Sequence, residues 1–529
     1  MEKKKKLIIL GVIILILAIS GLTYAILTWT SSKINIGLTS GCFTIDYTKG
    51  QDISGNLKLI NVRESFDGND NFVIKEGMGL SYANLGIKSS CTIEGYGSLY
   101  LNVTTLSDSF KEGGDSYNAL GYALLRNTSD FSNDKLTIEN LKGQSFEIID
   151  IKPITNTGTI KLVTEQLSNT ELNKYLIVIF VDNALAGNSI ASATFQGNIS
   201  ADANQGKAPV NAVSLITDLY NNATKTPVTN NSITYQYDTA HNLMKDNAGN
   251  IRYYGASPNN YIYFNCSDYS NQSSSTCETW RIIGVFNNKV KLIRGSQIGT
   301  YSWDNKNTST GAESAYGKND WTEARLMKLL NPGYESETTG GSLYYTSGSG
   351  NCYAGQNNAT KTCDFTSTGI KNDKTRGLIS EETYSLLGWN KSSIYANEIY
   401  EYERSTGKVY SDRSKEWTGK IALAYPSDYG YAVDLSKCSQ NLNNYENSTC
   451  KSNNWMKTIV NNGSSNVGLL LTPNSDGSYR TWYVGSPGYV DNGNYASYAY
   501  GVAPVLYLNS ELAVKSGTGS SSEPYQLAV

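Results

Sequence analysis

The sequence of 529 residues has a single histidine, His241, and only 10 prolines. One histidine excludes a His-rich metal site and leaves one candidate partner for a nucleophilic Ser or Cys. No two cysteines have the spacing of a zinc site, and no phosphate-binding loop or dinucleotide fingerprint occurs. The 44 Lys and Arg against 47 Asp and Glu give no positive excess to attract nucleic acid. We therefore expect a protein that is not an enzyme, uses no cofactor or metal and does not bind nucleic acid.

The N-terminus has a basic start followed by a long apolar run. Lys3 to Lys6 precede a nearly uninterrupted apolar stretch over 7–27, which is long enough to cross a bilayer of about 30 Å as one helix. Lysines ahead of the run keep that end in the cytoplasm, so the rest of the chain is expected to be extracytoplasmic. Two interpretations of residues 1–30 stay open. They form either a membrane anchor or a signal peptide cleaved near Ala25, after which the protein is secreted.

The eight cysteines agree with an oxidising compartment. Six of them form three close pairs whose intervening residues are mainly polar, so each pair predicts a local disulfide that closes a surface loop. The remaining two, in the N-terminal part, predict a fourth bridge. The predicted disulfide residues are Cys266 and Cys277, Cys352 and Cys363, Cys438 and Cys450, and Cys42 and Cys91.

The aromatic composition divides the chain in two. Eight of the 11 Phe precede residue 206, whereas 31 of the 39 Tyr follow it. Such a change indicates separate domains joined near 203–213. We expect a first domain over 31–203, a linker over 204–244 that contains a short helix, and a second domain over 245–529.

Local patterns predict mainly strands in both domains. Residues 175–181 form a short run rich in β-branched side chains, and 194–201 and 99–103 alternate apolar with polar residues, which favours an all-β sandwich. In the second domain, 280–293 has the pattern of a hairpin. Asp320 precedes a helical pattern that ends before Pro332.

The N-terminal part resembles secreted bacterial proteins of the TasA/camelysin type. The resemblance rests on the Lys-led apolar start that ends near Ala25, on 181–185 (VDNAL) and on 195–201 (FQGNISA). It implies a jelly-roll-like sandwich that is displayed at the cell surface or built into extracellular fibres. The peptidase activity associated with camelysin is not carried over, because the chain has no zinc-binding motif.

The C-terminal part resembles uncharacterised modules of bacterial surface proteins. The shared segments are 250–255 (NIRYYG), 278–284 (ETWRIIG), 482–484 (WYV) and 501–506 (GVAPVL). These modules are similar to the formylglycine-generating-enzyme and C-type-lectin-like fold, which implies an α+β domain with a ligand surface just before its last strand. Ala503 stands where many of these modules have Arg, so their internal ion pair is not carried over.

The region before the predicted last strand is dense in Tyr, Trp, Asn and Gly, a composition typical of binding surfaces. The alternative is that these aromatic residues only cover a core. The predicted ligand-binding residues are Tyr479, Trp482, Tyr483, Tyr489, Asp491, Asn494, Tyr495 and Tyr498.

The sequence thus predicts a non-catalytic cell-surface binding or adhesion protein, with a lectin-like head on a β-sandwich spacer. Its expected partners are an extracellular glycan or protein, and the membrane through 7–27. One alternative is a structural subunit of an extracellular fibre or biofilm matrix that self-associates through the sandwich. A secreted enzyme of the lectin-like fold is the other.

Overall fold

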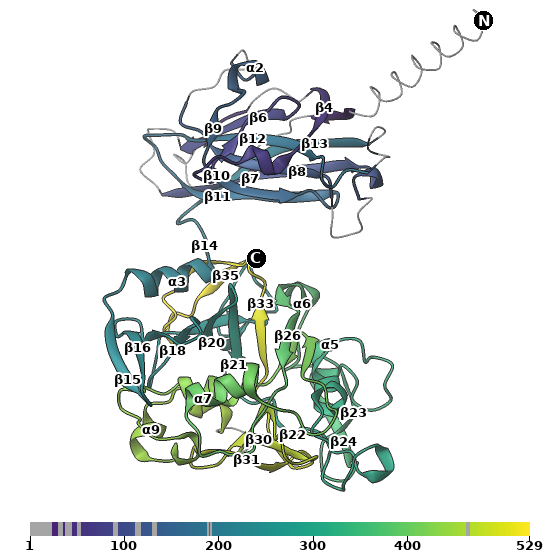
Figure 1. The fold of residues 1–529 in the computed structure, drawn as a ribbon, viewed down its shortest axis with the longest axis vertical. Helices are drawn as coiled ribbons and strands as arrows, with labels where there is room; N and C mark the ends of the chain where they lie inside the picture. The colour runs from purple at the N-terminus through teal and green to yellow at the C-terminus, as the bar shows by residue number, and fades with distance from the viewer. Residues whose placement is uncertain are drawn as a thin grey trace, which may run out of the picture. The chain divides into compact units, whose positions relative to one another are not determined.

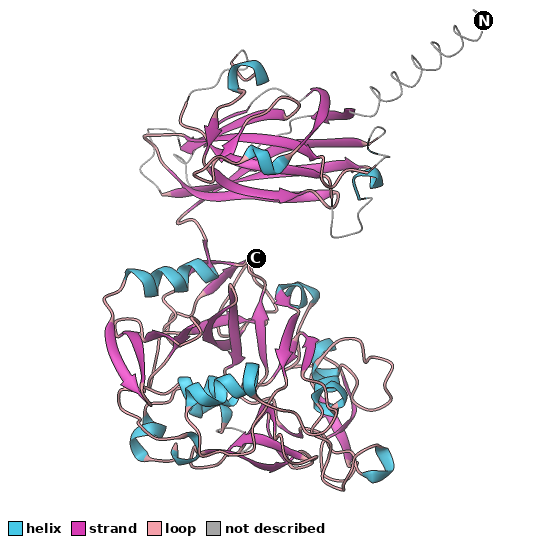
Figure 2. Cartoon of the chain, in the orientation of Figure 1, coloured by secondary structure: helices cyan, strands magenta, loops and turns pink. Residues whose placement is uncertain are grey.

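The computed structural model describes residues 24–29, 35–36, 45–49, 54–87, 94–111, 118–129, 135–187, 190, 193–461 and 466–529. The chain divides into two compact units, Met1–Ala208 and Pro209–Val529. This boundary lies within the interval 203–213 at which the aromatic composition changes. Both units consist mainly of β-strands with short helices between them (Figures 1 and 2).

The first unit contains one large sheet system. Its main path has the order β10-β8-β12-β4-β1-β13-β7-β11, with β2 on β13, β6 on β12 and β3 on β6. Its strands are β1 (Tyr24–Trp29), β2 (Asn35–Ile36), β3 (Ile45–Lys49), β4 (Ser54–Ile60), β6 (Gly79–Ile87), β7 (Gly95–Leu106), β8 (Leu120–Arg126), β10 (Ile148–Pro153), β11 (Gly158–Leu167), β12 (Asn173–Asp182) and β13 (Thr194–Gln205). The short strands β5 (Phe72–Val73) and β9 (Ser145–Phe146) pair separately, and α2 spans Ile138–Leu141.

Strand β12 is buried on both of its faces, and this explains the apolar run predicted as a strand over 175–181. Tyr175, Ile177 and Ile179 pack into one hydrophobic core with residues of β6, β7 and β13. Leu176 and Val178 pack into a second core on the opposite face. Because successive side chains of a strand point to opposite faces, burial on both sides requires the continuous apolar sequence that is found.

The structure corrects the predicted N-terminal helix at its end. Tyr24–Trp29 form β1, which pairs with β4 and β13, so the segment predicted over 7–27 is not helical through its last four residues. Pairing on both edges satisfies the backbone of β1 without a helix. Residues 1–23 lie outside the described chain. Among the residues described, no helix has the length and apolar character needed to span a membrane.

The second unit is built around a large sheet of order β15-β16-β17-β18-β20-β21-β33-β25, which β19 and β28 join through β20 and β33. These strands are β15 (Thr226–Asn230), β16 (Ile233–Asp238), β17 (Leu243–Lys245), β18 (Ile251–Tyr253), β19 (Tyr261–Phe264), β20 (Glu278–Phe286), β21 (Lys289–Arg294), β25 (Ile379–Ser380), β28 (Ile421–Ala422) and β33 (Val505–Leu508). A second sheet has the order β22-β32-β29-β30-β31, and a third has the order β14-β34-β35.

The remaining elements of the second unit are short. The strands of the two smaller sheets are β22 (Thr300–Ser302), β29 (Gly468–Pro473), β30 (Arg480–Val484), β31 (Val490–Tyr495), β32 (Ala499–Gly501), β14 (Val210–Asn211), β34 (Ala513–Ser516) and β35 (Gln526–Ala528). Two antiparallel pairs join β23 (Ser349–Tyr353) to β24 (Thr360–Asp364) and β26 (Glu382–Ser385) to β27 (Glu416–Gly419). The helices are α3 (Ala212–Asn222), α4 (Arg325–Leu330), α5 (Leu343–Thr346), α6 (Asp373–Leu378), α7 (Ala396–Glu401), α8 (Pro426–Tyr431), α9 (Ser448–Ser452) and α10 (Lys457–Val460).

Residues 210–244, which we expected within a linker over 204–244, belong instead to the fold of the second unit. The predicted short helix is α3, and its Val213, Ile216 and Tyr220 pack into the largest core of that unit. Strands β15, β16 and β17 form one end of its main sheet. The second unit therefore begins about 35 residues before the predicted domain boundary at 245, as its start at Pro209 shows.

Three of the predicted disulfides are present, joining Cys266 to Cys277, Cys352 to Cys363 and Cys438 to Cys450. The predicted bridge between Cys42 and Cys91 lies outside the described residues.

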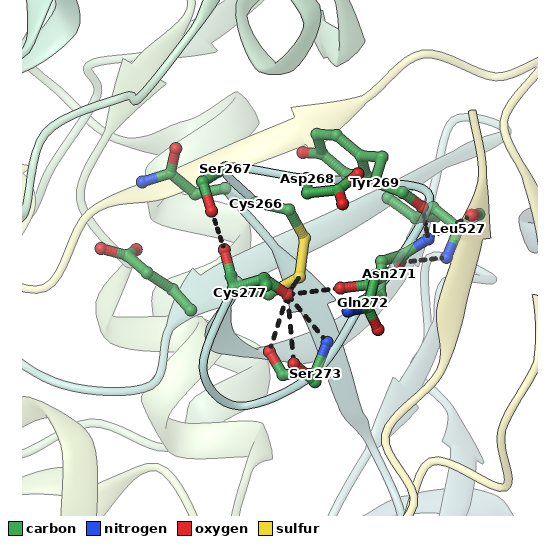
Figure 3. The surroundings of a disulfide bond; sticks show 12 residues. Cys266, Ser267, Asp268, Tyr269, Asn271, Gln272, Ser273, Cys277 and Leu527 are labelled. Carbon is green, nitrogen blue, oxygen red and sulfur yellow. Dashed lines mark hydrogen bonds between the residues drawn. A yellow bond between two sulfur atoms is a disulfide. The ribbon is translucent and has the colours of Figure 1, made fainter.

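The loop closed by the first of these bridges is not purely a surface loop. Gln272 is buried and exchanges two hydrogen bonds with the backbone of Leu527 in β35, donating at 2.7 Å and accepting at 2.8 Å (Figure 3). The bridge therefore fixes a loop that is docked on the last strand of the unit.

Candidate functional site

The five-stranded sheet β22-β32-β29-β30-β31 carries most of the predicted ligand-binding residues. Figure 1 shows β30, β31 and β22 together in one part of the second unit. Strand β31 alternates cleanly between the two faces of this sheet: Val490 and Asn494 are buried, whereas Asp491 and Tyr495 are partly exposed. One face therefore packs against the core and the other meets solvent.

The solvent-facing side of this sheet carries a connected set of tyrosine rings, which we call the tyrosine face. Each ring lies 4.5–6.5 Å, centroid to centroid, from at least one other ring of the set. Most of these side chains are half-buried, so the rings support one another and still expose an edge or a face. The tyrosine face consists of Tyr316, Tyr479, Tyr483, Tyr489, Tyr495, Tyr498 and Tyr500.

Tyr316 was not among the predicted residues, yet it is the most exposed member, at 42%. Its ring lies 4.5 Å from that of Tyr495 and 5.4 Å from that of Tyr479. The next residue, Gly317, has φ of 86°, and a Cβ there would lie 2.2 Å from the carbonyl oxygen of Asp304. Glycine is therefore required for the turn that places Tyr316 over the sheet. No local pattern marks Tyr316, because its partners come from a distant part of the sequence.

Buried polar groups hold the edge of the tyrosine face in place. The Asn319 amide donates to the backbone oxygens of Asn474, Gly477 and Arg480 at 2.7–3.0 Å. Arg413 in turn donates to the Asn319 side chain at 2.7 Å and forms a two-pronged ion pair with Glu313. These contacts fix the turn between β29 and β30, from which Tyr479 projects.

Two of the predicted ligand-binding residues do not lie on this surface. Trp482 is fully buried in a hydrophobic core, and Asn494 is only 4% exposed. The pairing of β30 with β31 shifts register between Thr481 and Tyr483, so Thr481 and Trp482 both turn inward and Tyr483 turns outward. Tyr479, Tyr483, Tyr489, Asp491, Tyr495 and Tyr498 are all partly exposed.

The electrostatics of the tyrosine face are simple. Burial raises the pKa of Tyr483, and the neighbouring Tyr489 and Asp491 raise it further, so its hydroxyl stays protonated at neutral pH. Asp491 lies opposite Tyr483 across the β30–β31 pair and forms no ion pair within the described chain. The surface therefore presents aromatic rings, tyrosine hydroxyls and the carboxylate of Asp491, groups that can pack against a ligand and form hydrogen bonds with it.

Two acidic turns, at Asp67 and Asp246, have their carboxylates occupied by hydrogen bonds within the turn. One carboxylate oxygen of Asp67 accepts from the backbone nitrogens of Asn69 and Asn71, and Asp246 accepts from those of Ala248 and Asn250. These are ordinary turn hydrogen bonds. In the part of the chain that the structure describes, no three His, Cys, Asp or Glu side chains gather in a way that could hold a metal ion.

Comparison with known proteins gives no relative: no family model matches the sequence, and no curated protein matches it.

Proposed function

We propose that this chain is a non-catalytic binding protein that acts outside the cytoplasm, with the second unit as its binding head and the first unit as a spacer. The observation that carries the proposal is the tyrosine face. Its seven tyrosine rings pack against one another, so their side chains are already ordered before a ligand binds. Binding therefore costs little side-chain conformational entropy.

The chemistry of this surface favours a glycan or a polar protein surface as ligand. Tyrosine combines a flat apolar ring with a hydroxyl that both donates and accepts hydrogen bonds. Flat rings pack against the apolar faces of sugars, and Asp491 adds an acceptor for sugar hydroxyls or for a basic side chain of a protein ligand.

The disulfides support the proposed location. Three bridges stabilise the second unit, and such bonds persist in oxidising compartments. The basic and apolar N-terminus, as a membrane anchor or as a cleaved signal peptide, would deliver the chain there. Within this proposal the first unit is a jelly-roll-like sandwich and the second is lectin-like.

The test is a binding screen of the purified, oxidised full chain against glycans, mucin and matrix proteins. We expect a saturable ligand whose affinity falls at least about tenfold in Tyr495→Ala, because Tyr495 contacts three other rings. Tyr334→Ala is the matched control. Tyr334 is also half-buried, but its ring contacts no ring of the tyrosine face.

A complete absence of ligands from a well-folded chain would contradict the proposal. Filaments seen by electron microscopy, and lost on deletion of 31–203, would then support the alternative of a fibre or matrix subunit. Substrate turnover that survives Cys→Ser changes and is lost on substitution of a carboxylate would instead support an enzyme.

A further inference from the structure

A pocket in the second unit, separate from the tyrosine face, contains two arginines in different electrostatic situations. Its volume is about 320 Å³, at the lower end of the range for small-molecule sites. It lies where β19, β20, the end of β21 and α10 meet. The lining residues are Tyr261, Glu278, Thr279, Arg281, Arg294, Gly295, Ser296, Thr458 and Ile459.

The charge of Arg294 is neutralised within the protein. Its Nε and Nη2 donate to the two carboxylate oxygens of Glu278 at 3.0 and 2.9 Å. Its Nη1 donates to the backbone and hydroxyl oxygens of Ser296. Arg294 and Glu278 together therefore have no net charge, and the pair offers an anionic ligand no excess positive charge.

Arg281 is different, because its side chain is buried without a carboxylate partner. The residue is only 5% exposed. It donates to the side-chain oxygen of Asn260 at 2.5 Å and to the backbone oxygen of Pro258 at 3.2 Å, and both acceptors are neutral. The Tyr261 ring lies 3.6 Å from its guanidinium carbon and the Trp455 ring 4.9 Å. Within the described chain, no Asp or Glu oxygen lies within ion-pair distance of Arg281.

Burying a charged group without a counter-charge costs free energy, and for Arg281 this cost lowers the pKa. Burial lowers the pKa of Arg281 to about 10. Burial also acts to lower the pKa of Arg294, but there the hydrogen bonds to Glu278 and its charge help to raise the pKa above its ordinary value. A buried cation that lines a pocket gains most from an anion supplied from outside, because the pairing removes this penalty.

We propose that this pocket binds a small molecule through a single carboxylate group, with Arg281 as the residue that pairs with it. The planar guanidinium matches a carboxylate in shape. One uncompensated positive charge matches a monoanion, whereas a phosphate dianion would meet the negative Glu278 without a second free cation. The Tyr261 ring and Ile459 give the carbon skeleton an apolar wall, and Thr279 and Thr458 offer hydroxyls.

The proposal does not depend on the tyrosine face and is tested with benzoate as the probe. The full chain is titrated with benzoate at constant ionic strength, and binding is followed by saturation-transfer NMR. We expect one saturable site, binding at least about tenfold weaker in Arg281→Gln, and inorganic phosphate competing less well than benzoate. Absence of saturation, equal binding by the variant, or phosphate competing as well as benzoate would each overturn the proposal.

A second variant separates recognition from folding. Glu278→Gln leaves Arg294 uncompensated as well, so we expect benzoate to bind more tightly and phosphate to begin to compete. If Glu278→Gln acted only by loosening the fold, benzoate would bind more weakly to it than to the wild type. That result would overturn the proposal, and it can be obtained even if Arg281→Gln fails to fold. Arg376→Gln removes an arginine that pairs with the exposed Asp373 and does not line this pocket, and we expect it to leave benzoate binding unchanged.

Discussion

The buried carboxylate of Asp428 pairs with two buried cations of the second unit. One of its carboxylate oxygens accepts from Lys291 at 2.5 Å and the other from Arg252 at 3.1 Å, and all three side chains are at most 2% exposed. Burial alone raises the pKa of Asp428, but the charges of Lys291 and Arg252 outweigh it and hold the pKa at about 2. For Lys291, burial outweighs the attraction of Asp428 and lowers the pKa to about 8.

Asp428→Asn should destabilise the second unit by about 3–5 kcal/mol, because it leaves the buried Lys291 without a counter-charge and removes one of the two carboxylates that pair with Arg252. It should also change the pH dependence. The pKa of Asp428 lies below its ordinary value of 3.8, so on acidification the unfolded chain takes up this proton before the folded chain does. Wild-type stability should therefore fall by about 2 kcal/mol as pH drops from about 4 to about 2.

Urea unfolding at several pH values measures both effects. The contribution of Asp428 is the part of the slope below pH 4 that disappears in the variant. Asp373→Asn is the control, since Asp373 is fully exposed, and it should leave the slope unchanged. Parallel curves for wild type and Asp428→Asn below pH 4 would contradict the assignment.

Trp482 and Asn494 show the limit of a prediction from amino-acid composition at the candidate site. The density of aromatic residues predicted a surface, but only the local register of β30 and β31 decides which rings face outward. That register contains an irregularity at Thr481 to Tyr483, which no alternation pattern in the sequence reveals. The composition therefore pointed to a segment that does carry exposed tyrosine rings, but it also placed the buried Trp482 and Asn494 among the surface residues.

Trp482→Ala should cost about 3–5 kcal/mol in unfolding free energy, because it empties a fully buried position. Tyr498→Ala removes a ring that is still partly exposed, and should cost clearly less. Guanidinium unfolding of the two variants distinguishes them. Equal losses would mean that the tyrosine face contributes to stability as a core does.

Strands and hairpins were predicted where local signals are strong. The hairpin expected over 280–293 is β20 and β21, and Asn287 and Asn288 at its turn both have positive φ, as a two-residue turn requires. The helix expected after Asp320 is interrupted: a short 3₁₀ turn over Trp321–Glu323 ends at Ala324, which is extended, and α4 follows. Tertiary packing overrides a continuous helical pattern here.

Gly284 in β20 is required by the close approach of β18. A Cβ at this position would lie 2.1 Å from the carbonyl oxygen of Ile251. Gly284→Ala should therefore destabilise the unit by at least about 1–3 kcal/mol. Gly377 in α6 has no atom within 4 Å of such a Cβ, so Gly377→Ala should be neutral or stabilising by up to about 1 kcal/mol. Thermal unfolding of both variants provides the measurement, and equal shifts would refute the steric argument.

The two units differ in how much of them the sequence anticipates. The change from Phe-rich to Tyr-rich sequence near 203–213 agrees with the boundary between the units at Ala208 and Pro209, because each unit has a hydrophobic core of its own composition. The extent of the second unit was missed, since β15 and β16 join its sheet only through β17 and β18. The sequence of a polar stretch such as 226–238 does not indicate that its strands pair one after another onto the main sheet.

Replacing Cys438 and Cys450 together by Ser should lower the stability of the second unit by about 2–3 kcal/mol, because the bridge closes a loop of 12 residues. Since each unit has its own core, calorimetry of the full chain should show two transitions. We expect the double variant to move only one of them. A shift of both by the same amount would show that the units unfold as one.

The small sheet of β14 and β34 brings together the two ends of the second unit. Val210 pairs with Val514, and the amide of Ala212 donates to the oxygen of Leu512 at 2.8 Å. When the first and last strands of a unit lie close together, the flanking chain can be joined to it without spanning the unit. We therefore expect the second unit to keep its core when it is inserted into a loop of an unrelated protein or is circularly permuted.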